Sequence, residues 1–222
     1  VATLCVMIPA IHAAEIYGGP AFDSTTGTGY LGPDMDFTRS TTAGNGIGIC
    51  HATKYIGNTD LGYRACRWDI TGSVELGHLG TNSDGITETM TQAVNMSGTV
   101  VGSAYVYSGE SGRGPRAVRW DAGSTVATEL GHIGLSASGF ANCHPYAINA
   151  SGTIVGFSSK LVGELGFGDR AVRWDAGGTA ATELGHLGTD TNGRTICYAE
   201  AVNDAGVAVG NASKYVGGTN YG

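Results

Sequence analysis

The sequence predicts an all-β protein, a β-propeller of four-stranded antiparallel blades with about 54 residues per repeat. The first observation is an internal repeat, because the block Glu-Leu-Gly-His begins at residues 75, 129 and 183, at intervals of 54 residues. The second is composition, since 38 of 222 residues are Gly and 41% are hydrophobic, which favours short apolar strands separated by glycine turns. The third is that each repeat contains four strand-like segments, as a propeller blade does.

The third repeat shows its four segments most clearly. We expect its strands at residues 146–149, 153–158, 170–175 and 182–187. Turns rich in Asn and Gly separate the first strand from the second and the third from the fourth, and these residues tolerate positive φ. We expect residues 157–169, and residues 103–115 in the preceding repeat, to form variable loops of constant length. A parallel β-helix is the weaker alternative because its coils are much shorter.

Two regions divide the chain. Residues 1–14 are uncharged and mostly apolar, too short for a membrane span, and predict part of a secretory signal peptide; a buried N-terminal strand is the alternative. Residues 15–222 then form the β-propeller repeat domain, which we expect to be an incomplete fragment whose last blade lacks its C-terminal strands. The alternative is a four-bladed propeller in which residues 15–63 and 189–222 complete one another.

The hairpin that contains Arg-Ala-Val-Arg-Trp carries regularly spaced charges. Its first copy is two residues shorter in the turn, yet Arg and Glu remain equally distant from the turn centre, which favours a cross-strand pair. We expect structural ion pairs in all three copies: Arg67 with Glu75, Arg119 with Glu129, and Arg173 with Glu183. The same symmetry about the turn centre places Arg116 opposite His132 and Val118 opposite Leu130.

Strand alternation predicts which of these residues face a neighbouring blade. Arg116, Val118 and Trp120 share one face of their strand, and Ala117 and Arg119 share the other. Because blades cover both faces of an inner sheet, we expect the three tryptophans to pack between blades: Trp68, Trp120 and Trp174.

Arginine and histidine recur once per repeat and are the candidate binding residues. A positive charge beside a histidine opposes a metal cation, so we expect no metal site and a mainly structural role. The weaker hypothesis is that these pairs face anionic groups of a glycan, such as uronates or sulfates. The residues concerned are Arg64, His78, Arg116, His132, Arg170 and His186.

Cysteine and oxygen-rich segments give weaker signals. Without Cys5, which lies in the signal segment, four cysteines remain, and an even number permits disulfides in an exported chain; buried free thiols are the alternative. Cys50 and Cys66 lie on successive strands, whereas Cys143 and Cys197 occupy the same position in adjacent repeats. We expect no cofactor, with calcium at the Asp190-Thr-Asn-Gly turn as a weak alternative.

Charge excludes several partners. The net charge is −7 with only 12 Lys+Arg, which argues against nucleic acid and against electrostatic docking on anionic lipid. No segment of the chain is expected to span a membrane. No paired carboxylates, nucleophile elbow or phosphate-binding loop is recognisable, so we expect no catalytic residue and favour a protein that is not an enzyme.

The repeated blocks resemble the HAF-type extracellular repeats of bacteria. The resemblance covers residues 41–222 and is most specific in Ile-Asn-x-x-Gly-x-x-Val-Gly and Leu-Gly-x-Leu-Gly; this chain has Arg where the family has His, and His where it has Thr. The resemblance implies a secreted or cell-surface protein with a propeller-like fold and no assigned enzymatic chemistry. We expect a binding or adhesion module for an extracellular glycan or protein ligand. A glycan-active lyase or hydrolase and a purely architectural envelope protein are the alternatives.

Overall fold

The computed structural model describes residues 28–30, 41–42, 46–56, 58–69 and 72–222. The regular secondary structure of these residues consists of β-strands, which form antiparallel sheets. This confirms the all-β prediction. No helix able to cross a membrane occurs in them. The predicted signal segment lies outside the described residues.

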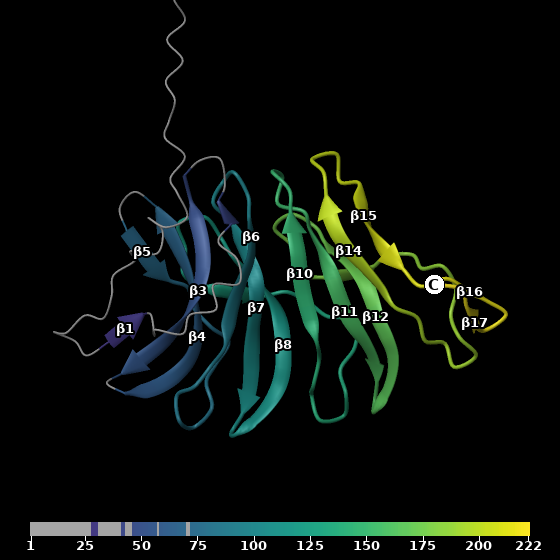
Figure 1. The fold of residues 1–222 in the computed structure, drawn as a ribbon, viewed down its shortest axis with the longest axis horizontal. Helices are drawn as coiled ribbons and strands as arrows, with labels where there is room; N and C mark the ends of the chain where they lie inside the picture. The colour runs from purple at the N-terminus through teal and green to yellow at the C-terminus, as the bar shows by residue number, and fades with distance from the viewer. Residues whose placement is uncertain (1–27, 31–40, 43–45, 57, 70–71) are drawn as a thin grey trace, which may run out of the picture.

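The first sheet belongs to the N-terminal repeat and has the order β1-β3-β4-β5, with β2 also paired to β3 (Figure 1). Its strands are β1 (Thr28–Tyr30), β2 (Thr41–Thr42), β3 (Gly48–Ile56), β4 (Thr59–Asp69) and β5 (Gly72–Glu75).

The second and third sheets are four-stranded meanders with the orders β6-β7-β8-β9 and β10-β11-β12-β13. The second contains β6 (Thr89–Val94), β7 (Val100–Ser108), β8 (Ser111–Trp120) and β9 (Ala127–Glu129). The third contains β10 (Cys143–Ile148), β11 (Ile154–Val162), β12 (Leu165–Trp174) and β13 (Ala181–Glu183). The four strands predicted for each repeat are therefore confirmed in these two sheets.

The C-terminal part contains two small sheets. β14 (Cys197–Val202) pairs with β15 (Ala208–Ala212), and β16 (Tyr215–Val216) pairs with β17 (Thr219–Asn220). Within the described residues none of these strands joins the first sheet. The alternative in which the two ends of the chain complete one blade stays a prediction, because much of residues 15–63 lies outside the described residues.

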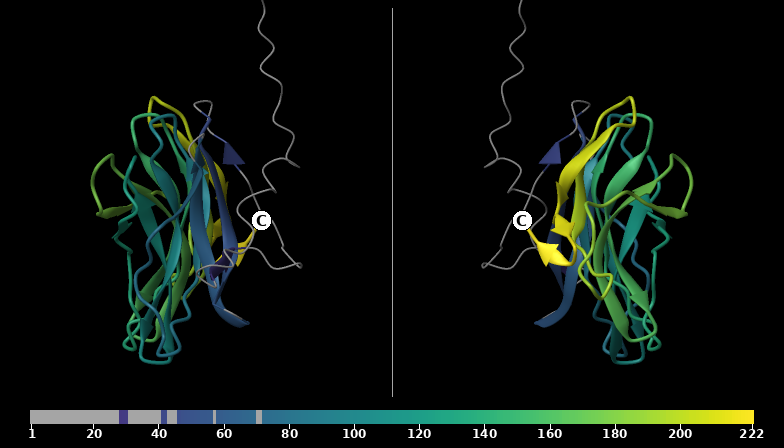
Figure 2. Two further views of the ribbon diagram at one scale, coloured as in Figure 1. Left: turned by 90° about the vertical axis from the view of Figure 1, so that its left-hand side faces the viewer. Right: turned by 90° about the vertical axis from the view of Figure 1, so that its right-hand side faces the viewer.

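Successive sheets lie face to face in a row from the first sheet to β14–β15, and their strand axes are roughly aligned (Figures 1 and 2). The first strand β10 contacts both β6 and β14 along this row. This arrangement brings the same position of successive repeats side by side.

The segments predicted as variable loops are strands instead. Residues 103–115 belong to β7 and β8, and residues 157–169 to β11 and β12. Each pair of strands is joined by a tight turn in which Gly109 or Gly163 has positive φ. Sequence variation there therefore does not indicate irregular backbone.

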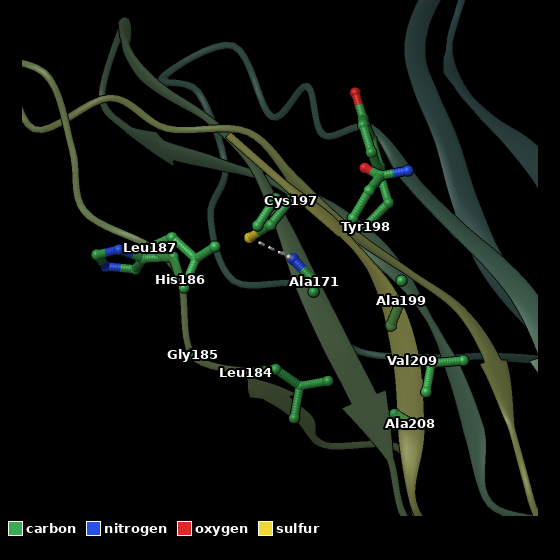
Figure 3. Close-up of a pocket in the computed structure, with 13 residues that line it drawn as sticks. Ala171, Leu184, Gly185, His186, Leu187, Cys197, Tyr198, Ala199, Ala208 and Val209 are labelled. Carbon is green, nitrogen blue, oxygen red and sulfur yellow. Dashed lines mark hydrogen bonds between the residues drawn. The ribbon is translucent and has the colours of Figure 1, made fainter. Parts of the chain in front are cut away.

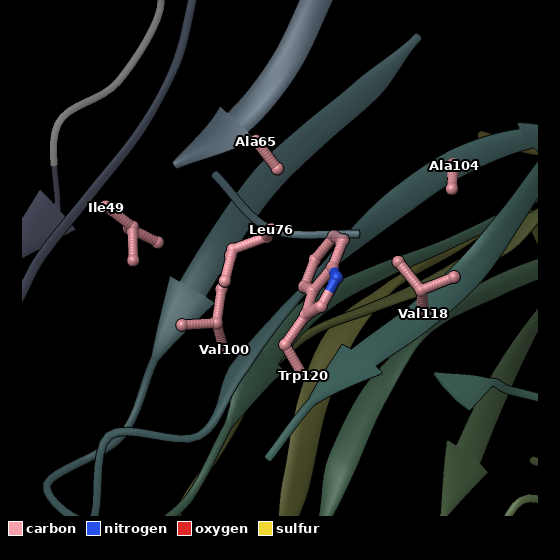
Figure 4. Close-up of a cluster of buried hydrophobic side chains, with 7 residues drawn as sticks. All are labelled: Ile49, Ala65, Leu76, Val100, Ala104, Val118 and Trp120. Carbon is pink, nitrogen blue, oxygen red and sulfur yellow. The ribbon is translucent and has the colours of Figure 1, made fainter. Parts of the chain in front are cut away.

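Buried side chains from two sheets form one cluster at each interface. Trp120 and Val118 of β8 point toward the first sheet, where Leu76 and Ala65 meet them (Figure 4). Ala117 of the same strand points the other way, into the next cluster, as alternation predicts. Each inner sheet is therefore covered on both faces.

Two of the three predicted tryptophan anchors are confirmed. Trp120 and Trp174 are fully buried, and their indole groups donate to Gly77 O and Gly131 O of the preceding sheet at 2.9 and 2.8 Å. Trp68 instead donates to a thiol of its own sheet. It is not an anchor between described sheets.

Turns between first and second strands are linked through asparagine. Asn149 accepts the amide of Thr153 on its side-chain oxygen at 2.8 Å, which closes its own turn. Its side-chain nitrogen donates to Asn203 O at 2.8 Å, and Asn95 donates to Asn149 O at 3.1 Å. Asn95 and Asn149 are buried, so these side chains are structural.

Candidate functional site

The repeated arginine that precedes Ala-Val-Arg-Trp connects neighbouring sheets. Arg116 is only 4% exposed, and its guanidinium donates to Ala141 O at 3.0 Å and Gly139 O at 2.8 Å, on the loop that leads into β10. It also donates to Arg113 O at 2.8 Å, and its Nε lies 3.3 Å from Glu129 Oε1. The side chain is therefore occupied by its own protein.

The equivalent arginines are also buried and also donate to backbone carbonyls, although Arg170 makes fewer of these bonds than Arg116. Arg64 donates to Thr87 O at 2.6 Å, and Arg170 donates to Gly193 O at 2.9 Å; both arginines are 3% exposed. A buried guanidinium that is already bonded to backbone carbonyls has no surface for an external anion. The observed contacts of these arginines hold loops between sheets, and the hypothesis that they face anionic glycans stays a prediction.

The predicted pairing of Arg119 with Glu129 is also wrong. Val118 lies opposite Glu129, and Arg119 lies opposite Thr128. A shift of one residue puts two side chains on opposite faces of a sheet. Arg119 consequently pairs with Asp121 at 2.7 Å, and Glu129 pairs with Arg116.

The other two copies follow the corrected register. Arg173 pairs with Asp175 at 2.7 Å, and Arg67 donates to a backbone carbonyl of the next sheet at 3.4 Å. Glu183 and Glu75 instead pair with lysines of their own sheets, at 2.7 and 2.9 Å, and with the buried arginines described above. All of these charges are structural, but the partners differ from the predicted ones.

The repeated histidines lie just after the fourth strands. Nδ1 of His78 accepts the amide of Gly80 at 3.1 Å, and Nδ1 of His186 accepts the amide of Gly188 at 3.2 Å. Burial and a neighbouring arginine lower the pKa of His78 and of His132, so both are neutral near pH 7. The neutral imidazole of His78, whose Nδ1 already accepts a backbone amide, contributes little to binding an anion.

Metal-binding signals are weak in the part of the chain that the structure describes. No group of three or more His, Cys, Asp or Glu side chains there has an arrangement suited to a metal ion. The carboxylate of Asp190 accepts the amides of Asn192 and Arg194, each at 2.8 Å, and so closes the turn considered for calcium. This geometry is that of an Asx turn.

The four described cysteines are buried free thiols. Cys50 lies opposite Cys66 on adjacent strands, whereas Cys143 and Cys197 lie one sheet apart, in β10 and β14, as the repeat predicts. Burial raises the pKa of Cys143 to about 11, so its thiol stays protonated and is a poor nucleophile. His144 bonds to Asn142 instead, at 2.9 Å.

A cavity that the sequence did not reveal crosses the first strands of three repeats. Its volume is about 620 Å³, and its lining is Gln92, Tyr146, Tyr198, Glu200 and Asn211. Gln92, Tyr146 and Glu200 occupy the same repeat position at intervals of 54 residues, on β6, β10 and β14. We call this the first-strand cavity.

Aromatic rings form one wall of the first-strand cavity. The ring centroids of Tyr146 and Tyr198 are 6.4 Å apart, and Phe157 lies behind both, at 5.5 and 5.1 Å. His144 stacks on Phe157 at 5.2 Å. Edge-to-face and tilted contacts of this kind fix ring orientation. The tyrosine rings are therefore held in place from behind.

Polar groups complete the first-strand cavity. The hydroxyl of Tyr198 donates to Asp169 at 3.1 Å, and the amide of Asn211 donates to Glu200 at 2.6 Å. Burial and the negative charge of Asp169 raise the pKa of Tyr198 to about 12, so the hydroxyl remains a donor at neutral pH. The lining carries one carboxylate, that of Glu200, and neither lysine nor arginine.

The sequence did contain a signal for this site, because one strand position varies between repeats whose other segments are nearly constant. The Arg-Ala-Val-Arg-Trp segment is nearly invariant between repeats, whereas the position of Gln92 changes to Tyr146 and then to Glu200. The backbone is constrained there, because a Cβ at Gly156 would overlap His144 O. A search confined to loops does not find variation on strands.

A second cavity lies between the third sheet and β14–β15. Its volume is about 470 Å³, and Leu184, Gly185, His186 and Ala199 are part of its mostly apolar lining (Figure 3). Of the six arginines and histidines proposed as glycan-facing, only His186 lines it. Its position at the junction of two repeats relates it to sheet packing.

No protein-family model matches the chain, and no curated protein sequence matches it either.

Proposed function

We propose that this chain is part of a secreted or cell-surface β-propeller of the HAF-like repeat type and acts as a binding module without catalysis. Successive four-stranded meanders packed face to face, with their first strands in contact, support a propeller because blades pack in this way around a central axis. The sequence resemblance supports the repeat type and the location outside the cell.

The first-strand cavity is the observation that carries the proposed binding function. It combines variable side chains with a frame that is nearly constant between repeats. Ligand sites are concave and combine apolar walls with a few placed polar groups, and this cavity has both. In a propeller the first strands line the central channel, where a ligand would contact several blades at once.

The lining favours a glycan that is neutral or carries a positive charge. The faces of Tyr146 and Tyr198 are suited to the apolar face of a sugar ring, and Gln92, Glu200 and Asn211 offer donors and acceptors for hydroxyl groups. A carboxylate without a nearby arginine or lysine disfavours uronates and sulfates. The expected anionic specificity is therefore replaced by a preference for uncharged or amino sugars.

A glycan-active enzyme is the second candidate. Glycoside hydrolysis generally requires two carboxyl groups flanking the bond. Among the residues that line this cavity, Glu200 alone has a carboxyl group. Asp169 is nearby but is bonded to Tyr198 and Ser159. The geometry therefore favours binding over hydrolysis.

A carbohydrate array followed by calorimetry tests the proposed function. We expect neutral or amino-sugar oligosaccharides to bind, and Tyr146→Ala to weaken binding at least tenfold. Tyr221→Ala is the matched control, because Tyr221 is 67% exposed and lies outside the cavity lining. An array without any bound glycan, or equal loss in both variants, contradicts the proposal. Release of shorter sugars during the measurement would favour the enzyme.

A further inference from the structure

The first interface between sheets contains a filled tryptophan socket. The indole of Trp120 packs on Leu76 and Ala65 and donates to Gly77 O at 2.9 Å (Figure 4). The amide of Gly77 donates in turn to Thr125 O at 2.7 Å, in the hairpin turn that follows the tryptophan strand. The glycine is therefore bonded on both sides by one incoming hairpin.

The second interface repeats this socket. Trp174 packs on Leu130 and Ala117 and donates to Gly131 O at 2.8 Å. The amide of Gly131 donates to Thr179 O at 2.6 Å. Leu130 is fully buried, as its counterpart in the first interface is. Two independent copies thus show what this kind of surface receives.

The third interface has the socket without its occupant. Leu184, Gly185 and Ala171 take the corresponding positions and line the cavity of about 470 Å³ (Figure 3). Gly185 is exposed, and within the described residues no hydrogen bond reaches its amide or carbonyl. Among the strands that the structure describes, only β14 pairs with β15, and Val209 of β15 is 62% exposed.

We infer that this surface binds a β-hairpin of the Arg-Ala-Val-Arg-Trp type, which pairs with β15 and inserts its tryptophan into the cavity lined by Leu184 and Gly185. An open sheet edge recruits an extended strand through backbone hydrogen bonds, and pockets beside it select the side chain. The two filled sockets identify that side chain as tryptophan. This inference does not depend on a glycan occupying the first-strand cavity.

A synthetic peptide with the sequence of residues 169–187 tests the inference, because it contains the strand, the turn and the Glu-Leu-Gly block. We expect saturable binding of one peptide per chain, measured by calorimetry and by changes in the amide NMR signals of β15. A peptide with Trp174→Ala is expected to bind at least tenfold more weakly. Equal binding of the two peptides, or no binding, overturns the inference.

A glycine variant of the protein provides the matched test on the receiving side. A Cβ at Gly185 meets nothing within 4 Å, so Gly185→Ala leaves the unbound fold intact. At Gly77 and Gly131 the same Cβ would lie 2.7 and 2.8 Å from the threonine carbonyl of the inserted hairpin. Gly185→Ala should therefore weaken peptide binding at least tenfold.

Gly112→Ala serves as the control, because its Cβ also meets nothing within 4 Å and Gly112 is distant from β15 in the sheet order. It should leave both the melting temperature and peptide binding unchanged. Peptide binding that is as tight to Gly185→Ala as to the unmodified chain overturns the inference. So does a peptide-independent dimer that blocks the peptide, because a second copy would then be the occupant.

Discussion

The third strands and the first strands of the repeats differ in how strictly they repeat. β8 and β12 both end in Arg-Ala-Val-Arg-Trp, whereas β6, β10 and β14 differ at the positions that point into the first-strand cavity. Among the constant residues, Arg116 and Trp120 bond to the neighbouring sheet, so a change at either position removes several contacts at once. The variable residues Tyr146 and Glu200 contact other side chains around the cavity rather than a repeated partner in the neighbouring sheet. Repetition in this protein therefore identifies sheet packing, and departure from repetition identifies the candidate binding surface.

The largest effect expected from this comparison is at the buried tryptophan. Trp120→Ala removes a fully buried ring and the bond to Gly77 O, and should lower the free energy of unfolding by about 4 kcal/mol. Trp68→Ala should cost clearly less, because Trp68 is only partly buried and bonds within its own sheet. Denaturant unfolding followed by circular dichroism measures both. Equal losses would mean that burial between sheets is not what distinguishes the two.

A smaller loss is expected when the interface arginine is removed. Arg116→Met leaves Ala141 O, Gly139 O and Glu129 without their partner and should cost about 3 kcal/mol in denaturant unfolding. Arg173→Met, at an exposed pair with Asp175, should cost below about 1 kcal/mol. If the two variants unfolded alike, the distinction between interface and surface arginines would fail.

A titration distinguishes the first-strand cavity from the rest of the surface. Because the pKa of Tyr198 is raised to about 12, the folded state binds this proton more tightly than the unfolded chain, whose tyrosines titrate near pH ~10. The resulting stability is fully present below pH ~10 and is lost as the pH rises through about 12.

Ultraviolet titration of the folded chain should show a tyrosine step near pH 12 that Tyr198→Phe removes. Asp169→Asn should move this step to lower pH, because it removes the negative charge that Tyr198 faces. A step that stays in place in Asp169→Asn would mean that burial alone raises the pKa.

The smallest structural change is expected at the paired thiols. Cys50 and Cys66 lie directly opposite on adjacent strands, a separation that permits a disulfide, whereas Cys143 and Cys197 lie a sheet apart. An oxidised small-molecule disulfide should accept two electrons and two protons from the first pair alone. Peptide mapping by mass spectrometry should therefore find one crosslink, from Cys50 to Cys66. A crosslink that includes Cys143 would contradict this placement.

The order of strands was predictable because it follows from periodicity, whereas their register was not. The two-residue deletion in the first hairpin preserves the pairing whether Arg119 or Val118 faces Glu129, so it does not distinguish the two registers. The observed turn places Trp120 opposite Ala127. This shift of one residue from the predicted register decides on which face of the sheet each charged side chain lies. Ion-pair partners therefore required coordinates.

The candidate binding site was not predictable for a related reason. Arg116 and its equivalents have the residue type and spacing of a repeated anion site, but burial commits them to carbonyls that come from loops distant in sequence. The cavity side chains come from three strands 54 residues apart, and only the stacking of sheets brings Gln92, Tyr146 and Glu200 together.

The asparagine links between turns connect the repeats in series along one rim. Asn149 both receives a bond from Asn95 and gives one to Asn203, so any tilt of one turn is transmitted to the turns before and after it. The angle between two successive sheets is then coupled to the angles between the other sheets of the row. A ligand that contacts three first strands would thus meet a surface whose curvature is set at the rim, remote from the residues it touches.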